Sequence, residues 1–367
     1  MAWNWQLRDW PEFIRDQQKL AAREARFLEQ AGVLIGTARH TSDEDRIELS
    51  ISVMSLEAID TSQIEGEKLD RASVQSSIQR ALGLKAAQAS AGPAENGIAE
   101  MMVDLLQTSG DPLSDAMLHR WHRKMLSGRT DLKSLGGYRE HEEPMQIISG
   151  ASYAPKVHYE APPSGAVAGH MAAFIAWFNQ TAPTGEAPLL AIERAGLAHL
   201  WFECVHPYED GNGRIGRAIS EKALAQGRQR PVFTSLAGAL LHRRKDYYRE
   251  LELASATLNA DRWLNWFADI ALEAQDASLR QVEFMLAKTR LFGRLAGQLN
   301  ARQERALLRM FAEGIDGFKG GLSAKNYMTI TGAPTATATR DLADMVVKGA
   351  LVREGELKST RYFLKLE

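Results

Sequence analysis

The sequence predicts a mainly α-helical protein with one short β-hairpin near its middle. Good helix formers such as Ala, Leu, Glu, Gln and Arg dominate most segments, and apolar residues recur in them at helical spacing. Only residues 136–163 differ in texture, because Gly, Pro, Tyr, Val and Ile cluster there. The chain has 367 residues, of which 45% are hydrophobic and 25% charged, and this is enough apolar content for two or three domains.

The expected elements follow one another along the chain. Helical patterns cover residues 12–31, 47–59, 69–84, 95–106, 114–126 and 167–178. The small and polar stretch 86–93 is expected to form a linker or a surface loop. Residues 146–148 have the composition of a strand, Ser149-Gly150 offers a turn, and Pro162-Pro163 ends the pattern. We therefore expect a short hairpin between residues 136 and 163.

Composition excludes several classes of protein. The 44 Lys and Arg residues against 46 Asp and Glu residues give a net charge of −2, which argues against a basic nucleic-acid coat or an acidic tail. The single cysteine, Cys204, excludes an intrachain disulfide and fits a reducing compartment. There is no apolar stretch of signal-peptide length at the amino terminus, and nowhere do about 18 apolar residues follow one another. We expect a cytoplasmic protein that does not contact membranes.

The densest chemistry lies in residues 206–217, His-Pro-Tyr-Glu-Asp-Gly-Asn-Gly-Arg-Ile-Gly-Arg. An apolar helix is expected before this segment, ending at His206 because Pro207 disfavours helix in the residue before it. A second helix is expected after it. Gly211 and Gly213 allow consecutive N–H groups to point into one concavity at the start of that second helix. Such a helix amino terminus attracts phosphate.

The charged residues of this segment suit phosphoryl or nucleotidyl transfer. Arg214 and Arg217 are three residues apart, so both guanidinium groups can face one site and bind phosphate oxygens. Asp210 is a hard oxygen ligand suited to Mg²⁺ shared with phosphates. His206 titrates near neutrality and can act as a general base. The simpler alternative is a turn between two core helices with solvated charges, but a turn needs neither the histidine nor both arginines.

This segment resembles the signature of the Fic family, His-Pro-Phe-x-Asp/Glu-Gly-Asn-Gly-Arg-x-x-Arg, and departs from it only at Tyr208, which replaces Phe. The resemblance implies transfer of AMP from ATP to a protein hydroxyl with release of pyrophosphate, by a nucleotidyltransferase of the protein adenylyltransferase type. It implies that His206 deprotonates the target Ser, Thr or Tyr and that Asp210 holds Mg²⁺. The residues that the resemblance assigns to the ATP phosphates are Gly211, Asn212, Gly213, Arg214 and Arg217. The intact Gly-Asn-Gly argues against the kinase branch of the family.

Two further segments are similar to parts of Fic proteins. The hairpin resembles the flap that docks the target segment, which places Ile148, Ser149 and Gly150 beside the ATP; the alternative is a plain surface hairpin. An edge strand suits docking because main-chain hydrogen bonds align peptides of varied sequence. Tyr247 and Tyr248 resemble the region that closes over the nucleoside, although paired tyrosines on a helix are often core or surface residues.

Residues 61–66, Thr-Ser-Gln-Ile-Glu-Gly, resemble the inhibitory helix motif of Fic proteins. The resemblance implies an inhibitor on the amino-terminal side of the catalytic signature. Glu65 is expected to form a bidentate pair with Arg217 and so to occupy the arginine that the γ-phosphate needs. The alternative is a helix end with one exposed glutamate. If the resemblance holds, Glu65→Gly raises self-AMPylation and His206→Ala abolishes it; whether Glu65 also serves to remove AMP stays open.

The carboxy-terminal segment has a different pattern. Three helical segments followed by two strand-like segments around Gly355 resemble a winged helix-turn-helix domain. Residues 301–367 carry 11 basic and 8 acidic side chains, a net charge of +3. Residues 335–348 would be the recognition helix, with Arg340 and Lys348 as its basic side chains. DNA binding, protein contact and dimer packing all stay open for this segment, since the charge is slight.

The expected domains are a helical extension with the inhibitory motif at 1–95, a Fic catalytic core at 96–290 and the winged-helix domain at 301–367. The leading hypothesis is a protein adenylyltransferase with ATP as AMP donor and Mg²⁺ as cofactor, autoinhibited through Glu65, acting on an unidentified target protein or on itself. The alternative is a DNA-binding regulator that uses a Fic-like domain as a nucleotide sensor without turnover. A different donor and a homodimer also stay open.

Overall fold

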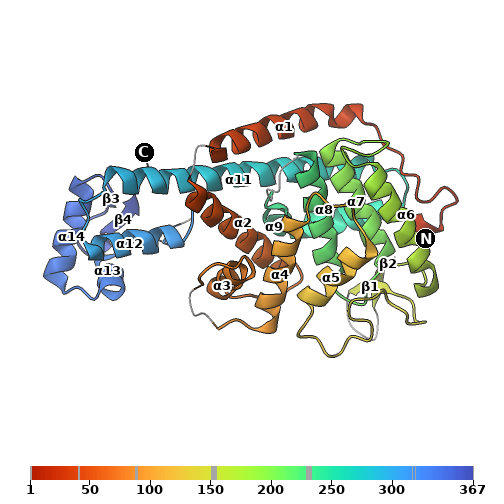
Figure 1. Ribbon diagram of the computed structural model, residues 1–367, viewed down its shortest axis with the longest axis horizontal. Helices are drawn as coiled ribbons and strands as arrows, with labels where there is room; N and C mark the ends of the chain where they lie inside the picture. Colours follow the sequence, from red (N-terminus) through yellow and green to blue (C-terminus); the bar gives the residue numbers. More distant parts are fainter. Residues whose placement is uncertain are drawn as a thin grey trace. The chain divides into compact units, whose positions relative to one another are not determined.

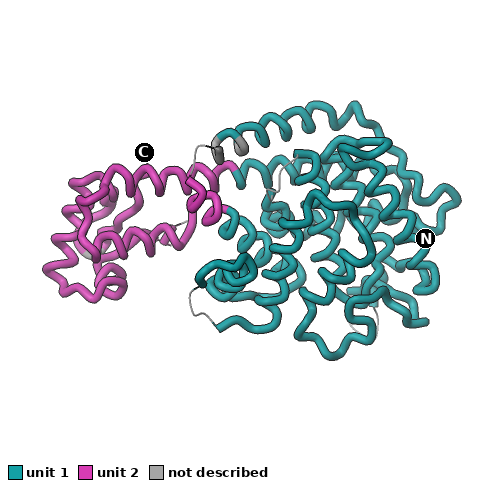
Figure 2. Tube along the Cα trace, in the orientation of Figure 1, with its two compact units in different colours: residues 1–36, 50–278 teal, residues 37–49, 279–367 magenta. Residues whose placement is uncertain are grey.

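Fourteen α-helices and two antiparallel two-stranded hairpins make up the regular structure of the described residues (Figure 1). The computed structural model describes residues 2–39, 42–86, 90–149, 155–228, 234–315, 317–318 and 320–366. The chain divides into two units (Figure 2), of which unit 1 comprises residues 1–36 and 50–278, and unit 2 comprises residues 37–49 and 279–367. The expectation of a mainly helical protein is confirmed, whereas the expected domain boundaries stay predictions.

The elements of the first half of the chain are α1 Gln18–Arg39, α2 Asp43–Ile64, α3 Arg71–Ala81, α4 Pro93–Gln107, α5 Asp115–Met125, β1 Gln146–Ser149, β2 Lys156–Glu160 and α6 Ser164–Gln180. Those of the second half are α7 Ala191–Val205, α8 Asn212–Gly227, α9 Leu236–His242, α10 Arg244–Ala254, α11 Asp261–Arg294, α12 Ala301–Ala312, α13 Ala324–Thr331, α14 Thr335–Val347, β3 Leu351–Glu354 and β4 Arg361–Leu364. Short 3₁₀ turns are present at Asn4–Gln6 and Leu357–Ser359.

The first helix begins later than expected because a tertiary contact removes its predicted first turn. Ile14 donates its N–H to the carbonyl of Leu258 at 2.8 Å and accepts from the N–H of Ala260 at 2.9 Å. These two hydrogen bonds give residue 14 an extended backbone, so that α1 begins at Gln18 and not near residue 12. Pairing with a segment almost 250 residues away is not visible in local propensity.

Helices α7 and α8 lie side by side in unit 1 and carry the site between their facing ends (Figure 1). Nearly every residue of both helices is buried, as the apolar pattern predicts for α7. Gly216 makes the close approach of α8 feasible, because a Cβ there would lie 2.5 Å from Glu203 Oε1 and 3.3 Å from His199. A larger residue at this position would push the two helices apart.

The hairpin of β1 and β2 is attached to the core through β2. Tyr159 is its one buried strand residue, and its hydroxyl donates to the carbonyl of Cys204 at 2.6 Å. Trp3 packs edge-on against Tyr159 with ring centroids 5.3 Å apart, and Trp5 donates its indole N–H to the carbonyl of Glu160 at 2.7 Å. Strand β1 is exposed along its whole length. The hairpin is therefore anchored at one strand and open at the other.

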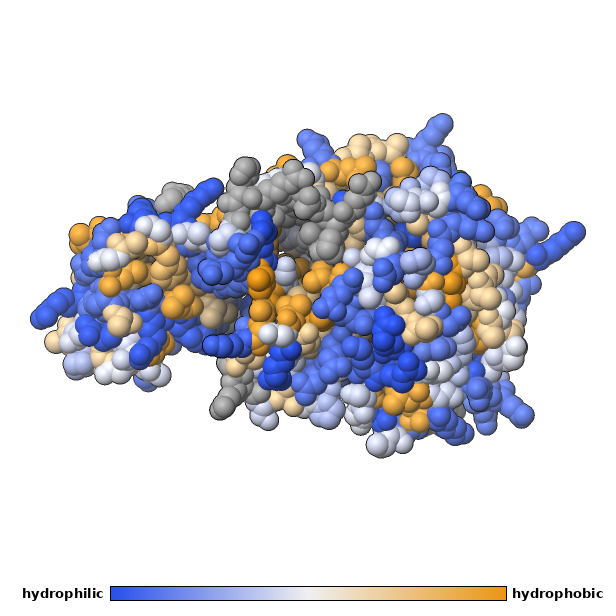
Figure 3. All heavy atoms as spheres, in the orientation of Figure 1, coloured by the Kyte–Doolittle hydropathy of each residue, from blue (hydrophilic) through white to orange (hydrophobic). Residues whose placement is uncertain are grey.

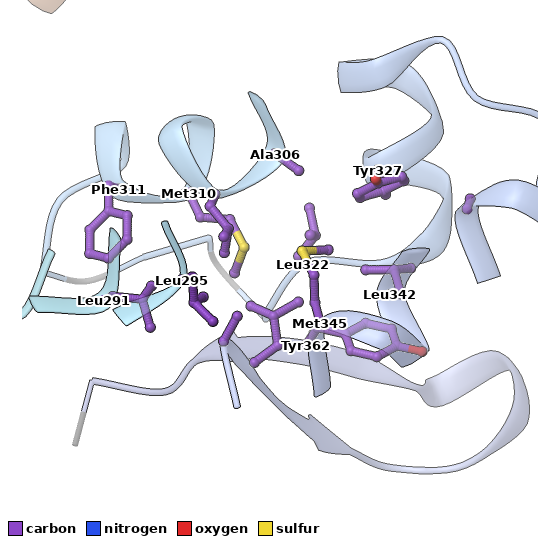
Figure 4. Packing of buried hydrophobic residues seen from close by; sticks show 14 of the residues in the cluster. Leu291, Leu295, Ala306, Met310, Phe311, Leu322, Tyr327, Leu342, Met345 and Tyr362 are labelled. Atoms are coloured by element: carbon purple, nitrogen blue, oxygen red, sulfur yellow. The ribbon is translucent and has the colours of Figure 1, made fainter. Parts of the chain in front are cut away.

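Unit 2 has a core of its own, formed by α12–α14, the end of α11 and the β3–β4 hairpin (Figure 4). The buried cluster includes Leu307, Met310, Leu342 and Met345, with Tyr362 from β4 packed against it. The order of three helices followed by a hairpin is the order that the sequence suggested. The assignment as a winged helix-turn-helix domain and its contact with DNA stay predictions.

No described helix has the length and apolar character needed to cross a bilayer. Figure 3 shows hydrophilic residues over much of the face in view, with apolar residues in smaller separate patches.

Candidate active site

His206 ends α7 in a left-handed conformation that turns its side chain away from the helix. Its φ is +48°, and its N–H still closes the last helical turn on the carbonyl of Phe202 at 2.9 Å. Arg139 holds the loop from behind, because its Nε donates to the carbonyl of His206 at 2.8 Å. Burial lowers the pKa of His206 to about 4, so the ring is neutral at pH 7 and can accept a proton. Its Nδ1 has no hydrogen-bond partner among the described residues.

The side chain of Asn212 stabilises the loop after His206 by hydrogen bonds to the backbone of the same loop. The side-chain oxygen of Asn212 accepts from the N–H of Tyr208 at 2.9 Å, and its Nδ2 donates to the carbonyl of Tyr208 at 2.8 Å. Gly211 has a φ of +81° and begins α8, a conformation that favours glycine. The amide side chain of Asn212 thus stabilises the loop, and only its backbone N–H is left for the phosphate contact that the sequence suggested.

Tyr208 replaces the phenylalanine of the Fic signature, and the structure gives its hydroxyl a partner. The hydroxyl lies 3.0 Å from Nδ1 of His119, and the ring stacks on His122 with centroids 4.2 Å apart. The residue is fully buried. The substitution therefore leaves no buried polar group without a partner, and the aromatic ring keeps an anchoring position in the core.

Asp210 lies at the edge of the loop, and both oxygens of its carboxylate accept hydrogen bonds. One oxygen accepts from Arg129 Nη1 at 2.5 Å, and the other accepts from the N–H of Gly211 at 2.5 Å. Arg129 also pairs with Asp131 at 2.6 Å. No group of three or more metal-ligating side chains occurs in the described part of the chain. Mg²⁺ bound together with nucleotide phosphates needs only one or two carboxylates, so that a lone Asp210 fits such a site.

Glu65 contacts Arg217, the last arginine of the segment. Its Oε1 accepts from Arg217 Nη2 at 2.7 Å, and Thr61 binds the same guanidinium through Nε at 2.7 Å. Burial by itself lowers the pKa of Arg217, but the neighbouring Glu65 outweighs it and the pKa is raised. The expected bidentate pair is wrong in detail, because Thr61 takes up one side of the guanidinium and Nη1 has no partner among the described residues.

Gly213 leaves room for this contact. A Cβ on Gly213 would lie 2.4 Å from Glu65 Oε1 and 3.1 Å from Arg217 Nη1. The carboxylate of Glu65 therefore lies directly against the first turn of α8, over the N–H groups to which the sequence assigned phosphate.

A second glutamate of the same segment, Glu67, occupies the other arginine. Its Oε2 accepts from Arg214 Nη1 at 2.9 Å, while Arg214 itself is almost fully buried. Gly66 has a φ of +87°, and the reversal of the chain there brings both glutamates to the start of α8. Sequence reasoning missed Glu67, although a second glutamate two residues after Glu65 and beside a glycine was a signal.

A cavity of about 750 Å³ brings seven of the expected site residues together, while Asp210, Gly211, Asn212, Arg214 and Arg217 are not part of its lining. Its lining includes His206, Glu65, Gly213, Ile148, Ser149, Tyr247 and Tyr248. Tyr247 is buried, and its hydroxyl lies 2.8 Å from Nε2 of His199, so most of its ring belongs to the core. Tyr248 is 42% exposed and donates to the carbonyl of Ile64 at 3.3 Å. The predicted contact at Gly150 lies outside the described residues.

Other residues at the cavity carried no signal in the sequence. His158 lies 2.5 Å from Ser149 Oγ and 3.0 Å from Glu252 Oε2, which connects the hairpin to α10. Glu203 lies beside His206 in the last turn of α7. Neither belongs to the segment 206–217, and only the folded chain brings them to it.

Two family descriptions match parts of this chain. Residues 112–224 match the Fic/DOC family, and residues 3–84 match a domain of unknown function (DUF4172). A probable protein adenylyltransferase from Aquifex aeolicus (strain VF5) is 25% identical over 120 residues, which are 33% of this chain and 32% of that protein. The chain thus spans about a third of the length of this curated relative. Glu65 lies in the first matched range, while His206 and Arg217 lie in the second.

Solved structures show the same fold at low identity. A Fic family protein from Desulfovibrio desulfuricans G20 has a TM-score of 0.52 and 19% identity, covering 93% of this chain and 95% of its own. A Fic domain containing signaling protein from Bacteroides thetaiotaomicron VPI-5482 has a TM-score of 0.52 and 17% identity, covering 70% and 97%. The fold is therefore that of these helical proteins. The part of the chain that is similar to the Fic/DOC family, residues 112–224, contains the whole segment 206–217.

Proposed function

We propose that this chain is a protein adenylyltransferase that transfers AMP from ATP to a Ser, Thr or Tyr hydroxyl and that Glu65 holds it inactive. The observation that carries the proposal is the contact of Glu65 with Arg217, because Glu65 also lines the cavity that contains His206. The Fic/DOC match and the adenylyltransferase relative support the reaction type.

Each residue of the site has a separate role in the proposed transfer of AMP. The neutral imidazole of His206 takes the proton of the target hydroxyl, whose oxygen attacks the α-phosphorus, and pyrophosphate leaves with the electrons of the broken P–O bond. The N–H groups at the start of α8 face the phosphates. Arg214 and Arg217 neutralise the phosphate charge once Glu67 and Glu65 release them.

Asp210 would hold Mg²⁺ in this reaction, and the ion would neutralise charge on the phosphates. The aspartate must first lose its contact with Arg129. Arg129 has a second partner in Asp131, so it can leave Asp210 without losing every ion pair.

The open strand of the hairpin is the proposed docking edge for the target. Among the described residues β1 pairs only with β2, so its other edge is free for main-chain hydrogen bonds. Ile147 and Ile148 are 42% and 56% exposed and offer apolar contact to a bound peptide.

Self-labelling of a Glu65→Gly variant tests the function. Incubation with ATP and Mg²⁺ is expected to add the mass of one AMP to this variant, roughly tenfold to a hundredfold faster than to the wild type, because the charged hydrogen bond to Arg217 is lost. His206→Ala in the same background is expected to lower the rate by about 10²- to 10⁴-fold.

The readout is intact-protein mass spectrometry over time. Circular dichroism shows whether the variants are folded. Equal labelling of the wild type and both variants, or no AMP adduct on any of them, would contradict the proposal.

A further inference from the structure

Glu203 is a buried carboxyl group that faces the back of His206. It lies three residues before His206, and its Oε2 is 3.9 Å from His206 Nδ1. The side chains of Glu203 and His206 are only 11% and 14% exposed. Glu203 Oε1 has no hydrogen-bond partner among the described residues, and His206 Nδ1 has none of good geometry, although the backbone of Glu203 lies close enough to the ring to raise its pKa. Two adjacent groups of low exposure without a full set of hydrogen bonds cost stability, and a hydrogen bond between them would remove part of that cost.

The surroundings of Glu203 come from several elements. Gly216 of α8 leaves room for the carboxyl, since a Cβ there would lie 2.5 Å from Oε1. The charged and titratable groups around it are Arg217 of α8, Glu65 at the end of α2, Tyr247 of α10, Tyr159 of β2, and His199, Cys204 and His206 of its own segment. Burial raises the pKa of Glu203 to about 8; Arg217 lowers it and Glu65 raises it further.

We propose that Glu203 is a positioning residue for the transfer reaction, which orients the His206 ring through Nδ1 and stabilises the imidazolium that forms at Nε2. The inference rests on the proposed function. The proton of the target hydroxyl moves to Nε2. The N–H at Nδ1 donates a hydrogen bond to the Glu203 carboxylate and keeps its proton. A shortening of about 1 Å converts the present separation into a hydrogen bond. Glu203 is proposed to act through His206.

The inhibitory segment acts on this pair as well as on Arg217. The carboxylate of Glu65 favours the protonated form of Glu203, which cannot stabilise an imidazolium. Removing Glu65 lowers the pKa of Glu203, so the carboxylate that supports His206 forms at lower pH. Release of Glu65 therefore frees Arg217 to bind phosphate. It also favours the carboxylate form of Glu203, which lies beside His206.

The experiment compares Glu65→Gly with the double variant Glu65→Gly/Glu203→Gln. Single-turnover self-AMPylation is measured between pH 5.5 and 9.5. The parent is expected to show a rate that rises with pH through a limb below about 8, because the active form of Glu203 is the carboxylate. The glutamine variant is expected to lose this limb and to be at least about tenfold slower, with the half-saturating ATP concentration unchanged within about twofold.

Two variants make the comparison specific. Glu186→Gln makes the same chemical change at an exposed residue and is expected to match the parent. Glu203→Asp keeps an ionisable group and is expected to be slower but to retain the limb. An unchanged rate and limb in Glu203→Gln, or loss of the limb in a folded Glu203→Asp variant, would overturn the inference.

A second measurement does not depend on activity. Nitrogen-15 NMR of the His206 ring reports which nitrogen carries the proton, and the parent at pH 8.5 is expected to show Nδ1–H. Replacement of Glu203 by Gln is expected to change this tautomer population. If no AMP is transferred at any pH, the proposed function fails. If the ring spectrum is the same in both proteins, the inference about Glu203 fails whatever the activity.

Discussion

Buried polar groups are satisfied in unit 2 and left open at the site of unit 1. In unit 2 the carboxylate of Asp341 accepts from Arg302, Asn300 and the hydroxyl of Tyr327, at 2.8 to 3.2 Å for the shortest contact of each. No buried side-chain nitrogen or oxygen in the described part of unit 2 lacks a partner. In unit 1, by contrast, four site residues each retain such an atom; these are Glu203, His206, Arg214 and Arg217.

The difference separates a structural network from a binding site. An unsatisfied buried group costs stability. Unit 1 has such atoms away from the site as well, for example in Asn4 and Gln275, but those at the site all belong to ionisable side chains of one region. The four atoms at the site of unit 1 belong to ionisable side chains, and two of these, Glu203 and His206, line the cavity. Those of unit 2 are closed around one carboxylate between three helices. Disturbing the closed network should cost stability, and disturbing the open site should change activity.

The largest expected effect is the loss of stability of unit 2 in the variant Asp341→Ala. The substitution removes the common acceptor of Arg302, Asn300 and Tyr327, so unit 2 should lose about 3 kcal/mol of stability. Hydrogen exchange measured by mass spectrometry should show faster exchange in α12–α14. In the Glu65→Gly background the AMPylation rate should stay within about twofold of the parent. A large loss of transfer with unchanged exchange would reverse the roles assigned to the two units.

A smaller effect is expected from Glu67→Gln. The neutral amide weakens the contact with the buried Arg214, and self-AMPylation should rise about twofold to fivefold, because Glu67 is 38% exposed and its ion pair is screened by water. The rate should stay below that of Glu65→Gly. Glu186→Gln serves as the control for the change of charge. A rate equal to the wild type would show that Arg214 is not restrained by this pair.

The smallest effect is expected from Tyr208→Phe, which restores the residue of the Fic signature. His119 loses the partner of its Nδ1 but keeps packing against the ring, so the free energy of unfolding should fall by about 1 kcal/mol. Urea unfolding measures this change. The AMPylation rate in the Glu65→Gly background should not change beyond about twofold. A tenfold loss of activity would mean that the hydroxyl belongs to the site and not to the core.

Local pattern was enough to predict part of this structure. The apolar run before His206, the glycines after it and the proline between them predict two helices joined by a tight loop, and α7 and α8 have this arrangement. The start of α1 was misplaced, because Ile14 pairs with Leu258 and Ala260 across the fold. Local propensity cannot register a partner so distant in the chain.

The residues of the site were also predicted only in part, because some of their partners are distant in the sequence. Glu65 was identified because a motif surrounds it. Glu203 has no motif and becomes visible only through its position beside His206. The position of Glu67 next to Gly66 was a weak signal, and only the contact with Arg214 shows its meaning. Asn212 was expected at the phosphates, yet its side chain satisfies the backbone of Tyr208. The sequence shows that an amide is present, but it does not show which of two nearby polar groups the amide will bind.

What the sequence determined by itself is the chemistry within one short segment: a histidine, an aspartate, a glycine nest and two arginines at helical spacing. Such residues are neighbours in the chain, so their proximity survives any packing. Only the tertiary structure decided which groups from α2 and α7 lie against them. That outcome depends on the close packing of α7 on α8 at Gly216 and on the turn at Gly66, because burial and distance set both the pKa of Glu203 and the pairing of each arginine.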